Sequence, residues 1–170
     1  PMVTLLRPAL IGVLGQHGQD PEILAQARVE AQAFLADPSR VAPSLAGTWL
    51  ALAAQRGDRA LFEGYRRALE ATRDTSQREQ LLEGLAHFGD AALRDEALRY
   101  ALGGSLRMQE LLVVPFVQAH ALDQRAPVFA WMTERYPQIA QRLPEAFLPQ
   151  LAHVAGGCDE ALAERARQFF

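Results

Sequence analysis

The stretch LLEGLAHFGDAALRDEAL, residues 81–98, decides the fold of this chain. Its first half places Leu81, Leu82 and Leu85 on one side of a helix, because residues three and four apart share a helical face. The turn that ends in Asp90 interrupts this pattern, and a second apolar helical stretch follows, with Leu93 three residues after the aspartate. Two apolar helices joined by a short turn predict a helical hairpin.

The aspartate of this turn has counterparts along the chain. Asp20, Asp58, Asp90, Asp123 and Asp159 follow one another at intervals of 32 to 38 residues, each between two apolar helical stretches. A repeat of this length is typical of stacked helical hairpins, in which each unit buries its apolar face on its neighbours. Strand signals are nearly absent. We therefore predict an all-α chain, an α-α superhelix (a HEAT- or armadillo-like solenoid) of about ten helices in antiparallel hairpins, forming a single domain over residues 1–170.

Each of the five aspartates is predicted to cap the second helix of its hairpin. An Asp side chain accepts hydrogen bonds from the free N–H groups of a helix start, and its charge favours the positive end of the helix. Pro21, directly after Asp20, suits the first helical position, where its missing N–H costs nothing. Ser76 and Glu79 have the spacing of a capping box and predict a helix start in the third unit.

Apolar residues at helical spacing predict the buried face of each helix. In the second helices this residue is expected three positions after the aspartate: Ile23, Leu61, Leu93, Ala126 and Leu162. In the first helices the expected residues are Leu10, Val13 and Leu14; Trp49, Leu50 and Ala53; Leu81, Leu82, Leu85 and Phe88; Val113, Val114 and Val117; and Leu148, Leu151 and Ala152. Trp49, Trp131 and the cluster at residues 81–85 are expected to form core between units.

The segment LLVVPFV, residues 111–117, is apolar on all sides. A helix of this kind is typically buried on all sides. Pro115 within it is expected to kink the helix, since proline removes one hydrogen bond and crowds the preceding turn. The segment is therefore expected at the centre of the superhelix or beneath another domain.

Composition excludes several classes of protein. The formal net charge is −3, and all 17 basic residues are Arg, a bias typical of a GC-rich genome. This balance argues against nucleic acid or an anionic membrane as the main partner. No run is long and apolar enough for a membrane span, and no secretory signal is visible. Because Pro1 is not an initiator residue, we expect the chain to be a C-terminal fragment of a larger multidomain protein.

Residues that often carry chemistry have structural explanations here. His17, His87 and His120 each precede an aspartate by three residues, which suits the last turn of a helix better than a metal or acid–base array. Cys158 is alone and suits a loop–helix junction better than a nucleophile. The pair Arg66–Arg67 fits a solvated helix face better than an anion site. HExxH, GxSxG, closely spaced Cys/His sets and phosphate-binding glycine loops do not occur in the sequence.

One polar cluster, Arg107-Met108-Gln109-Glu110, lies between a glycine turn and the apolar segment. It has two interpretations. In the structural one it is the first turn of the apolar helix. In the functional one it places a guanidinium, an amide and a carboxylate at the edge of whatever the solenoid encloses.

At this cluster the chain begins to resemble a known family. The order is Phe-Gly-Asp at residues 88–90, ALRDEAL at 92–98, a glycine break and LRMQE at 106–110, then AWMTERY at 130–136, a Gly-Gly-Cys turn at 156–158 and ERARQFF at 164–170. This order resembles the C-terminal helical domain of aminopeptidase N-type zinc peptidases, the group that includes the endoplasmic-reticulum and puromycin-sensitive aminopeptidases. The likeness is clearest from about Leu81 to Phe170.

The resemblance implies a non-catalytic role for this chain within a zinc metalloaminopeptidase. In that family the helical domain arches over the catalytic domain, encloses the peptide chamber and limits which substrates enter. Zinc is held in the catalytic domain by HExxH and a distal Glu, and the family has an exopeptidase GAMEN motif. Neither motif occurs here, so no catalytic residue, zinc ligand or cofactor is assigned to this chain.

The implied partners are the catalytic domain of the same parent chain and peptide substrates, for which Arg107, Gln109 and Arg142 are candidate chamber contacts. The alternative from another class is a free-standing HEAT-like scaffold that binds a protein partner. The compartment stays open, with the cytoplasm slightly favoured. Specificity for the N-terminal residue and oligomeric state also stay open.

Overall fold

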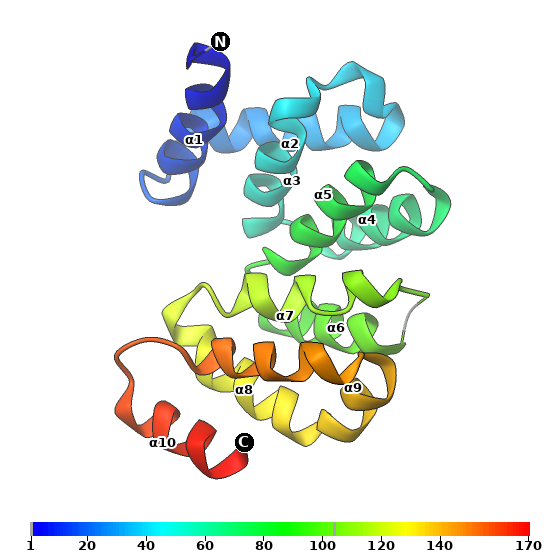
Figure 1. Ribbon diagram of the computed structural model, residues 1–170. Helices are drawn as coiled ribbons and strands as arrows, with labels where there is room; N and C mark the ends of the chain where they lie inside the picture. Colours follow the sequence, from blue (N-terminus) through cyan, green and yellow to red (C-terminus); the bar gives the residue numbers. More distant parts are fainter. Residues whose placement is uncertain (1, 104) are drawn as a thin grey trace. The chain divides into compact units, whose positions relative to one another are not determined.

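The structure is a computed structural model that describes residues 2–103 and 105–170, with side chains from Leu6 onward. The described residues contain no strand and are mostly helical (Figure 1). The α-helices are α1 (Met2–Gln16), α2 (Pro21–Ala36), α3 (Pro43–Gln55), α4 (Arg59–Ala71), α5 (Thr75–Ala86), α6 (Ala91–Gly103), α7 (Val113–Gln118), α8 (Arg125–Glu134), α9 (Tyr136–Arg142) and α10 (Glu160–Phe169). The 3-10 helices of the described residues, η1 (Pro38–Arg40), η2 (Met108–Glu110), η3 (Leu122–Gln124) and η4 (Glu145–Ala155), lie between them. The predicted all-α class is confirmed.

The chain divides into two compact units, Pro1–Leu98 and Arg99–Phe170. Helix α6 begins in the first unit and ends in the second. The single domain and the superhelical stacking of the hairpins both stay predictions.

Helix α3 is the centre of the first unit, where it packs against α1, α2 and α5. No residue between Pro43 and Gln55 is charged, and a helix that is apolar on most sides is stable only when other helices cover it. Trp49, Leu50 and Ala53 are buried, which confirms the predicted face of this helix.

An aromatic cluster joins α4 to the end of α5. The ring of Phe88 meets the rings of Phe62 and Tyr65 edge to face, with centroids 5.2 and 5.7 Å apart. The hydroxyl of Tyr65 donates to the carbonyl oxygen of Leu50 at 2.9 Å, so this fully buried polar group is satisfied. All four residues predicted to form the core of the third helical hairpin, Leu81, Leu82, Leu85 and Phe88, are buried.

Four of the five aspartates cap helices as predicted. The carboxylates of Asp20, Asp58, Asp90 and Asp159 each accept from the backbone N–H three residues later, at 2.9 to 3.0 Å. The prediction for Asp123 is wrong. Asp123 lies inside η3 and its carboxylate accepts from the side chain of Gln124 instead. The backbone around Asp123 forms consecutive hydrogen-bonded turns. Asp123 therefore does not precede a helix start with free N–H groups.

The capping box predicted at Ser76 and Glu79 is also wrong. Helix α5 begins at Thr75, two residues before the start that a Ser76 cap would give, and its cap is Asp74, whose carboxylate accepts from the N–H of Gln77 at 2.9 Å. Ser76 therefore already lies within the first turn. Asp74, two residues before Ser76, is the cap in its place.

The predicted inward face of α1 is wrong as well. Leu10, Val13 and Leu14 are 60%, 56% and 47% exposed, whereas Ile11 and Gly15 are buried. A Cβ on Gly15 would lie 2.6 Å from a methyl carbon of Leu52. Helix α1 thus approaches α3 through its glycine side, which turns the leucine side outward.

The second unit is less regular. Helix α8 packs against α7, α9, η3 and η4, and α10 packs against η4. The segment around residues 148–152 forms a 3-10 helix that contains Pro149, which cannot donate a helical hydrogen bond. Leu151 is buried as predicted, while Leu148 and Ala152 are only half-buried.

The apolar segment 111–117 departs from its prediction in two ways. Val114 and Pro115 are buried, but Val113, Phe116 and Val117 remain half-exposed. Helix α7 begins at Val113, so Pro115 occupies the first turn, where backbone N–H groups have no helical partner to lose. The proline therefore lies near a helix start and does not kink a helix interior. Trp131 is likewise only half-buried.

Candidate functional site

Gln109 lies on η2 and Arg107 is the residue directly before it, at the entry to α7. The backbone N–H of Arg107 donates to the carboxylate of Glu110 at 2.8 Å, and its guanidinium Nε lies 3.9 Å from the other carboxylate oxygen. The Glu110 side chain is 8% exposed and that of Arg107 is 38% exposed. Glu110 therefore closes the start of η2 and holds a partly exposed arginine beside it. The functional interpretation of the cluster stays a prediction.

A groove of about 240 Å³ runs beside η2 within the second unit. Its lining combines two amides with apolar side chains: Met108, Gln109, Leu112, Val113, Phe116, Leu143, Phe147 and Gln150. Met108 and Phe147 are 46% and 43% exposed. The groove exists because the apolar segment 111–117 is not fully covered. It can hold an apolar side chain, and its two amides can each donate and accept a hydrogen bond.

Arg142 lies apart from this lining, at the end of α9. Its guanidinium donates to the carbonyl oxygens of Leu102 at 2.5 Å and Leu106 at 3.1 Å. Leu102 belongs to the last turn of α6, whose carbonyls have no partner within the helix. Arg142 thus satisfies a free carbonyl at the end of α6 and binds the backbone carbonyl directly before Arg107. Arg107 and Gln109 thus lie at the start of η2 and within it, whereas Arg142 binds the backbone of Leu102 and Leu106.

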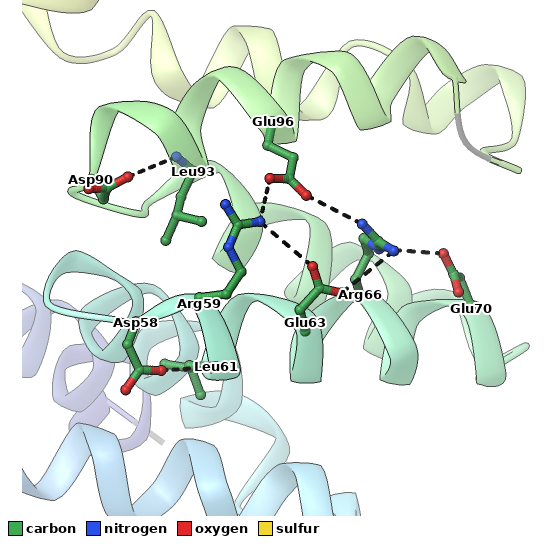
Figure 2. A network of polar contacts seen from close by, with 9 residues as sticks. All are labelled: Asp58, Arg59, Leu61, Glu63, Arg66, Glu70, Asp90, Leu93 and Glu96. Carbon is green, nitrogen blue, oxygen red and sulfur yellow. Dashed lines mark hydrogen bonds and ion pairs between the residues drawn. The ribbon is translucent and has the colours of Figure 1, made fainter.

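A network of charges joins α4 to α6 in the first unit (Figure 2). Glu96 pairs with Arg59 and, at 3.4 Å, with Arg66; Glu63 lies 3.7 Å from Arg59 and 3.5 Å from Arg66. Glu70 adds a contact of 3.9 Å to Arg66. The hydrogen bond to Glu96 raises the pKa of Arg59. Arg66 therefore already has three carboxylate neighbours, which weakens its interpretation as an anion site.

Sequence reasoning missed this network, although part of its signal was present. Glu63, Arg66 and Glu70 stand three and four residues apart, the spacing at which side chains meet on a helix. The pairing with Glu96 had no such signal, because it joins two helices.

The three histidines follow the ends of helices and do not lie in the last turns as predicted: His17 and His87 come one residue after α1 and α5, and His120 two residues after α7. His87 caps α5, and its Nδ1 meets the carbonyl oxygen of Glu83 at 2.8 Å. Cys158 is exposed in the loop before α10. Within residues 2–103 and 105–170, no three His, Cys, Asp or Glu side chains gather where they could hold a metal ion. None of the helices described in this chain has the length and apolar character to cross a membrane.

Comparison with known proteins gives one family. The model of the ERAP1-like C-terminal domain matches residues 1–170, which include both compact units. No curated protein sequence matches the chain significantly. The family match confirms the resemblance that the residue order had indicated.

Proposed function

The chain belongs to the ERAP1-like C-terminal domain family, and on that premise we propose that it is the non-catalytic C-terminal domain of a zinc-dependent aminopeptidase. Such an enzyme removes N-terminal amino acids from peptides. In this role the chain encloses the peptide chamber and controls which substrates reach the catalytic domain. The observation that carries the proposal is the family match over the whole chain.

Zinc chemistry belongs to the parent enzyme in this proposal. Bound zinc activates a water molecule for attack on the peptide carbonyl. The described residues of this chain do not fit a zinc site, because three metal-ligating side chains never come together among them. The contribution of the chain is therefore steric and electrostatic.

Three residues are proposed to act on the peptide. Arg107 supplies a positive charge that the buried Glu110 holds in place, and Gln109 supplies an amide at the rim of the apolar groove. Arg142 is retained as a chamber residue, and its bonds to Leu102 and Leu106 suggest that it also positions the loop before Arg107. Together they would favour peptides long enough to reach the second unit.

The test compares substrates of different length on the full-length parent enzyme. For Arg107→Ala and for Gln109→Ala we expect KM for long peptides to rise by a factor of roughly 3 to 10, with kcat/KM for an aminoacyl-nitroanilide unchanged. Arg99→Ala is a matched control, since Arg99 is an exposed arginine of the same unit outside the groove. Unchanged KM and unchanged length preference in both variants would remove these residues from the proposal.

A second test separates the peptidase domain from a free-standing scaffold. Under the proposal, the gene upstream of Pro1 encodes HExxH followed by a distal Glu, and the purified 170-residue chain neither binds zinc nor releases an amino acid. A start codon directly before Pro1 would favour the scaffold, and turnover by the purified chain would overturn the non-catalytic assignment.

A further inference from the structure

Another cavity of the second unit, of about 420 Å³, borders α9, η4 and the end of α10. Its lining is mostly apolar: Tyr136, Glu145, Leu148, Pro149, Ala152 and Phe170. Among these residues only Glu145 carries a charge. The cavity shares no lining residue with the groove beside η2, so it is a separate site.

The 3-10 helix η4 supplies most of this lining. Side chains three residues apart lie one above another on a 3-10 helix. Glu145 and Leu148 form one such pair, and Pro149 and Ala152 form another. The helix therefore presents a carboxylate beside an apolar surface.

Aromatic rings form another part of the lining. The ring of Tyr136 meets those of Phe169 and Phe170 edge to face, with centroids 5.2 and 6.2 Å apart. The cluster continues to Phe129, whose ring centroid lies 6.4 Å from that of Phe169. The guanidinium of Arg165 lies 5.9 Å from the centre of the Phe129 ring, a distance at which an aromatic face attracts a cation. The cluster thus already holds one arginine, at a ring that does not line the cavity.

The carboxylate of Glu145 joins no ion pair in the part of the chain whose side chains are described. The arginines nearest to it in the sequence bind elsewhere: Arg135 lies 3.1 Å from Glu134, and Arg142 donates to two backbone carbonyl oxygens. None of the described lining residues is basic. The cavity therefore places a carboxylate without an ion-pair partner beside aromatic rings.

We propose that this cavity binds an arginine side chain of a partner polypeptide. The planar guanidinium packs against an aromatic ring of the lining and donates two parallel hydrogen bonds to the carboxylate of Glu145. The methylene groups of the arginine lie against Leu148 and Pro149. The inference does not depend on the proposed aminopeptidase role.

An arginine fits this cavity better than a lysine or a neutral side chain does. A guanidinium is planar and weakly hydrated, so it stacks on rings and pairs with a carboxylate through two bonds, whereas an ammonium group is compact and strongly hydrated. A neutral apolar side chain would cover the cavity without pairing with Glu145. The chain itself places an arginine over an aromatic ring at Arg59 and Phe62, 5.7 Å apart, as well as at Arg165.

The experiment compares three capped tripeptides, acetyl-Gly-Arg-Gly-amide and its versions with lysine and with citrulline in place of arginine. Citrulline has nearly the shape of arginine and no charge. Each peptide is titrated into the isotope-labelled 170-residue chain, and binding is followed by the NMR chemical shifts of the backbone amides. The arginine peptide is expected to bind with a Kd of about 1 to 10 mM, at least about fivefold more tightly than the citrulline peptide. The shifts are expected to concentrate at Tyr136, Glu145 and Phe170.

Two variants and two matched controls locate the binding. Glu145→Gln is expected to remove most of the preference for arginine over citrulline, whereas Glu160→Gln, which changes an exposed glutamate of α10 outside the lining, leaves it unchanged. Tyr136→Leu is expected to weaken arginine binding about threefold or more, because it removes an aromatic face. Tyr136→Phe keeps the ring and is expected to keep the affinity. The spectrum of each variant shows whether it is folded.

Several outcomes would overturn the proposal. They are equal affinity for the arginine and citrulline peptides, shifts confined to residues away from the cavity, and a preference for arginine that Glu145→Gln leaves intact. Lysine binding as tight as arginine binding would assign the cavity to cations in general. Loss of binding when two glycines are added after Phe170 would assign the attraction to the terminal carboxylate and remove Glu145 from it.

Discussion

The two compact units have similar sequence patterns, but their helices differ in length and regularity. In the first unit α2, α3, α4 and α5 are regular helices of 12 to 16 residues. In the second unit α7 and α9 have six and seven residues, and the apolar stretch before α10 is a 3-10 helix. Both units have apolar residues at helical spacing, so hydrophobic periodicity does not explain the difference.

The positions of the prolines explain part of it, although Pro8 lies inside the long helix α1 and the short helix α9 has its proline near the start. In the first unit Pro21 and Pro43 each stand at the first position of a helix, where proline has no hydrogen bond to break. In the second unit Pro115 and Pro149 stand within the apolar stretches themselves. Shorter helices cover one another less completely, and the groove beside η2 is the result.

The largest expected effect compares one leucine in each unit. Leu85 is fully buried, so Leu85→Ala should lower the free energy of unfolding by about 2 to 5 kcal/mol. Leu112 lines the open groove of the second unit and is half-exposed, so the loss from Leu112→Ala should fall at or below the lower end of that range. Urea denaturation followed by circular dichroism measures both. Equal losses, or a loss below about 0.5 kcal/mol for Leu85→Ala, would contradict the comparison.

The next effect compares two aspartates that look alike in the sequence. Asp90→Ala removes a carboxylate that accepts from the N–H of Leu93 at 3.0 Å, and should cost about 1 kcal/mol. Asp123→Ala removes a side chain that caps no helix, and should change the free energy of unfolding by less than about 0.5 kcal/mol. The same urea titrations apply. A larger loss for Asp123→Ala would mean that Asp123 caps a helix after all.

A smaller effect concerns the charge network of the first unit. The side chain of Glu96 is 23% exposed and contacts two arginines, so Glu96→Gln should cost up to about 1 kcal/mol at low ionic strength. Most of that loss should disappear in about 1 M salt, which screens partly exposed charges. Glu134→Gln is the control in the second unit, since it removes a single exposed pair with Arg135. A loss independent of salt would show that Glu96 acts through packing.

The smallest expected effect depends on pH. Partial burial raises the pKa of Glu83, the neighbouring Glu79 raises it further, and His87 lowers it. An acid with a raised pKa in the folded state stabilises the fold while protonated, and this contribution is lost as the pH rises through the folded pKa. The change that Glu83→Gln makes in the free energy of unfolding should therefore be more stabilising at pH 7 than at pH 4. Thermal unfolding at both pH values measures this change. An equal effect at the two pH values would contradict it.

Local signals in the sequence succeeded where one short-range interaction decides the outcome. An aspartate before an apolar turn caps the next helix wherever the backbone opens there, as at Asp20, Asp58, Asp90 and Asp159. At residues 74–79 two possible caps competed, and the choice of Asp74 depends on where the preceding helix ends. The candidate residues Arg107 and Gln109 were identified from the same kind of local break.

Helix orientation could not be predicted in the same way. The sequence shows two possible faces of α1, the side with Leu10 and Leu14 and the side with Ile11 and Gly15. The choice depends on how closely α3 can approach, and the approach of Leu52 to Gly15 decides it. The contacts of Arg142 with Leu102 and of Arg59 with Glu96 also join residues 37 to 40 positions apart.

The sequence by itself determined the helical class, the places of most turns and the family, because caps, breakers and periodicity act over a few neighbouring residues. The tertiary structure alone decided which apolar faces are covered and which arginines are bound. Those outcomes depend on contacts between distant helices, where a close approach at one glycine or an early helix start at one proline decides what stays exposed. The outward leucines of α1 and the groove beside η2, with its incompletely covered segment 111–117, arise in this way.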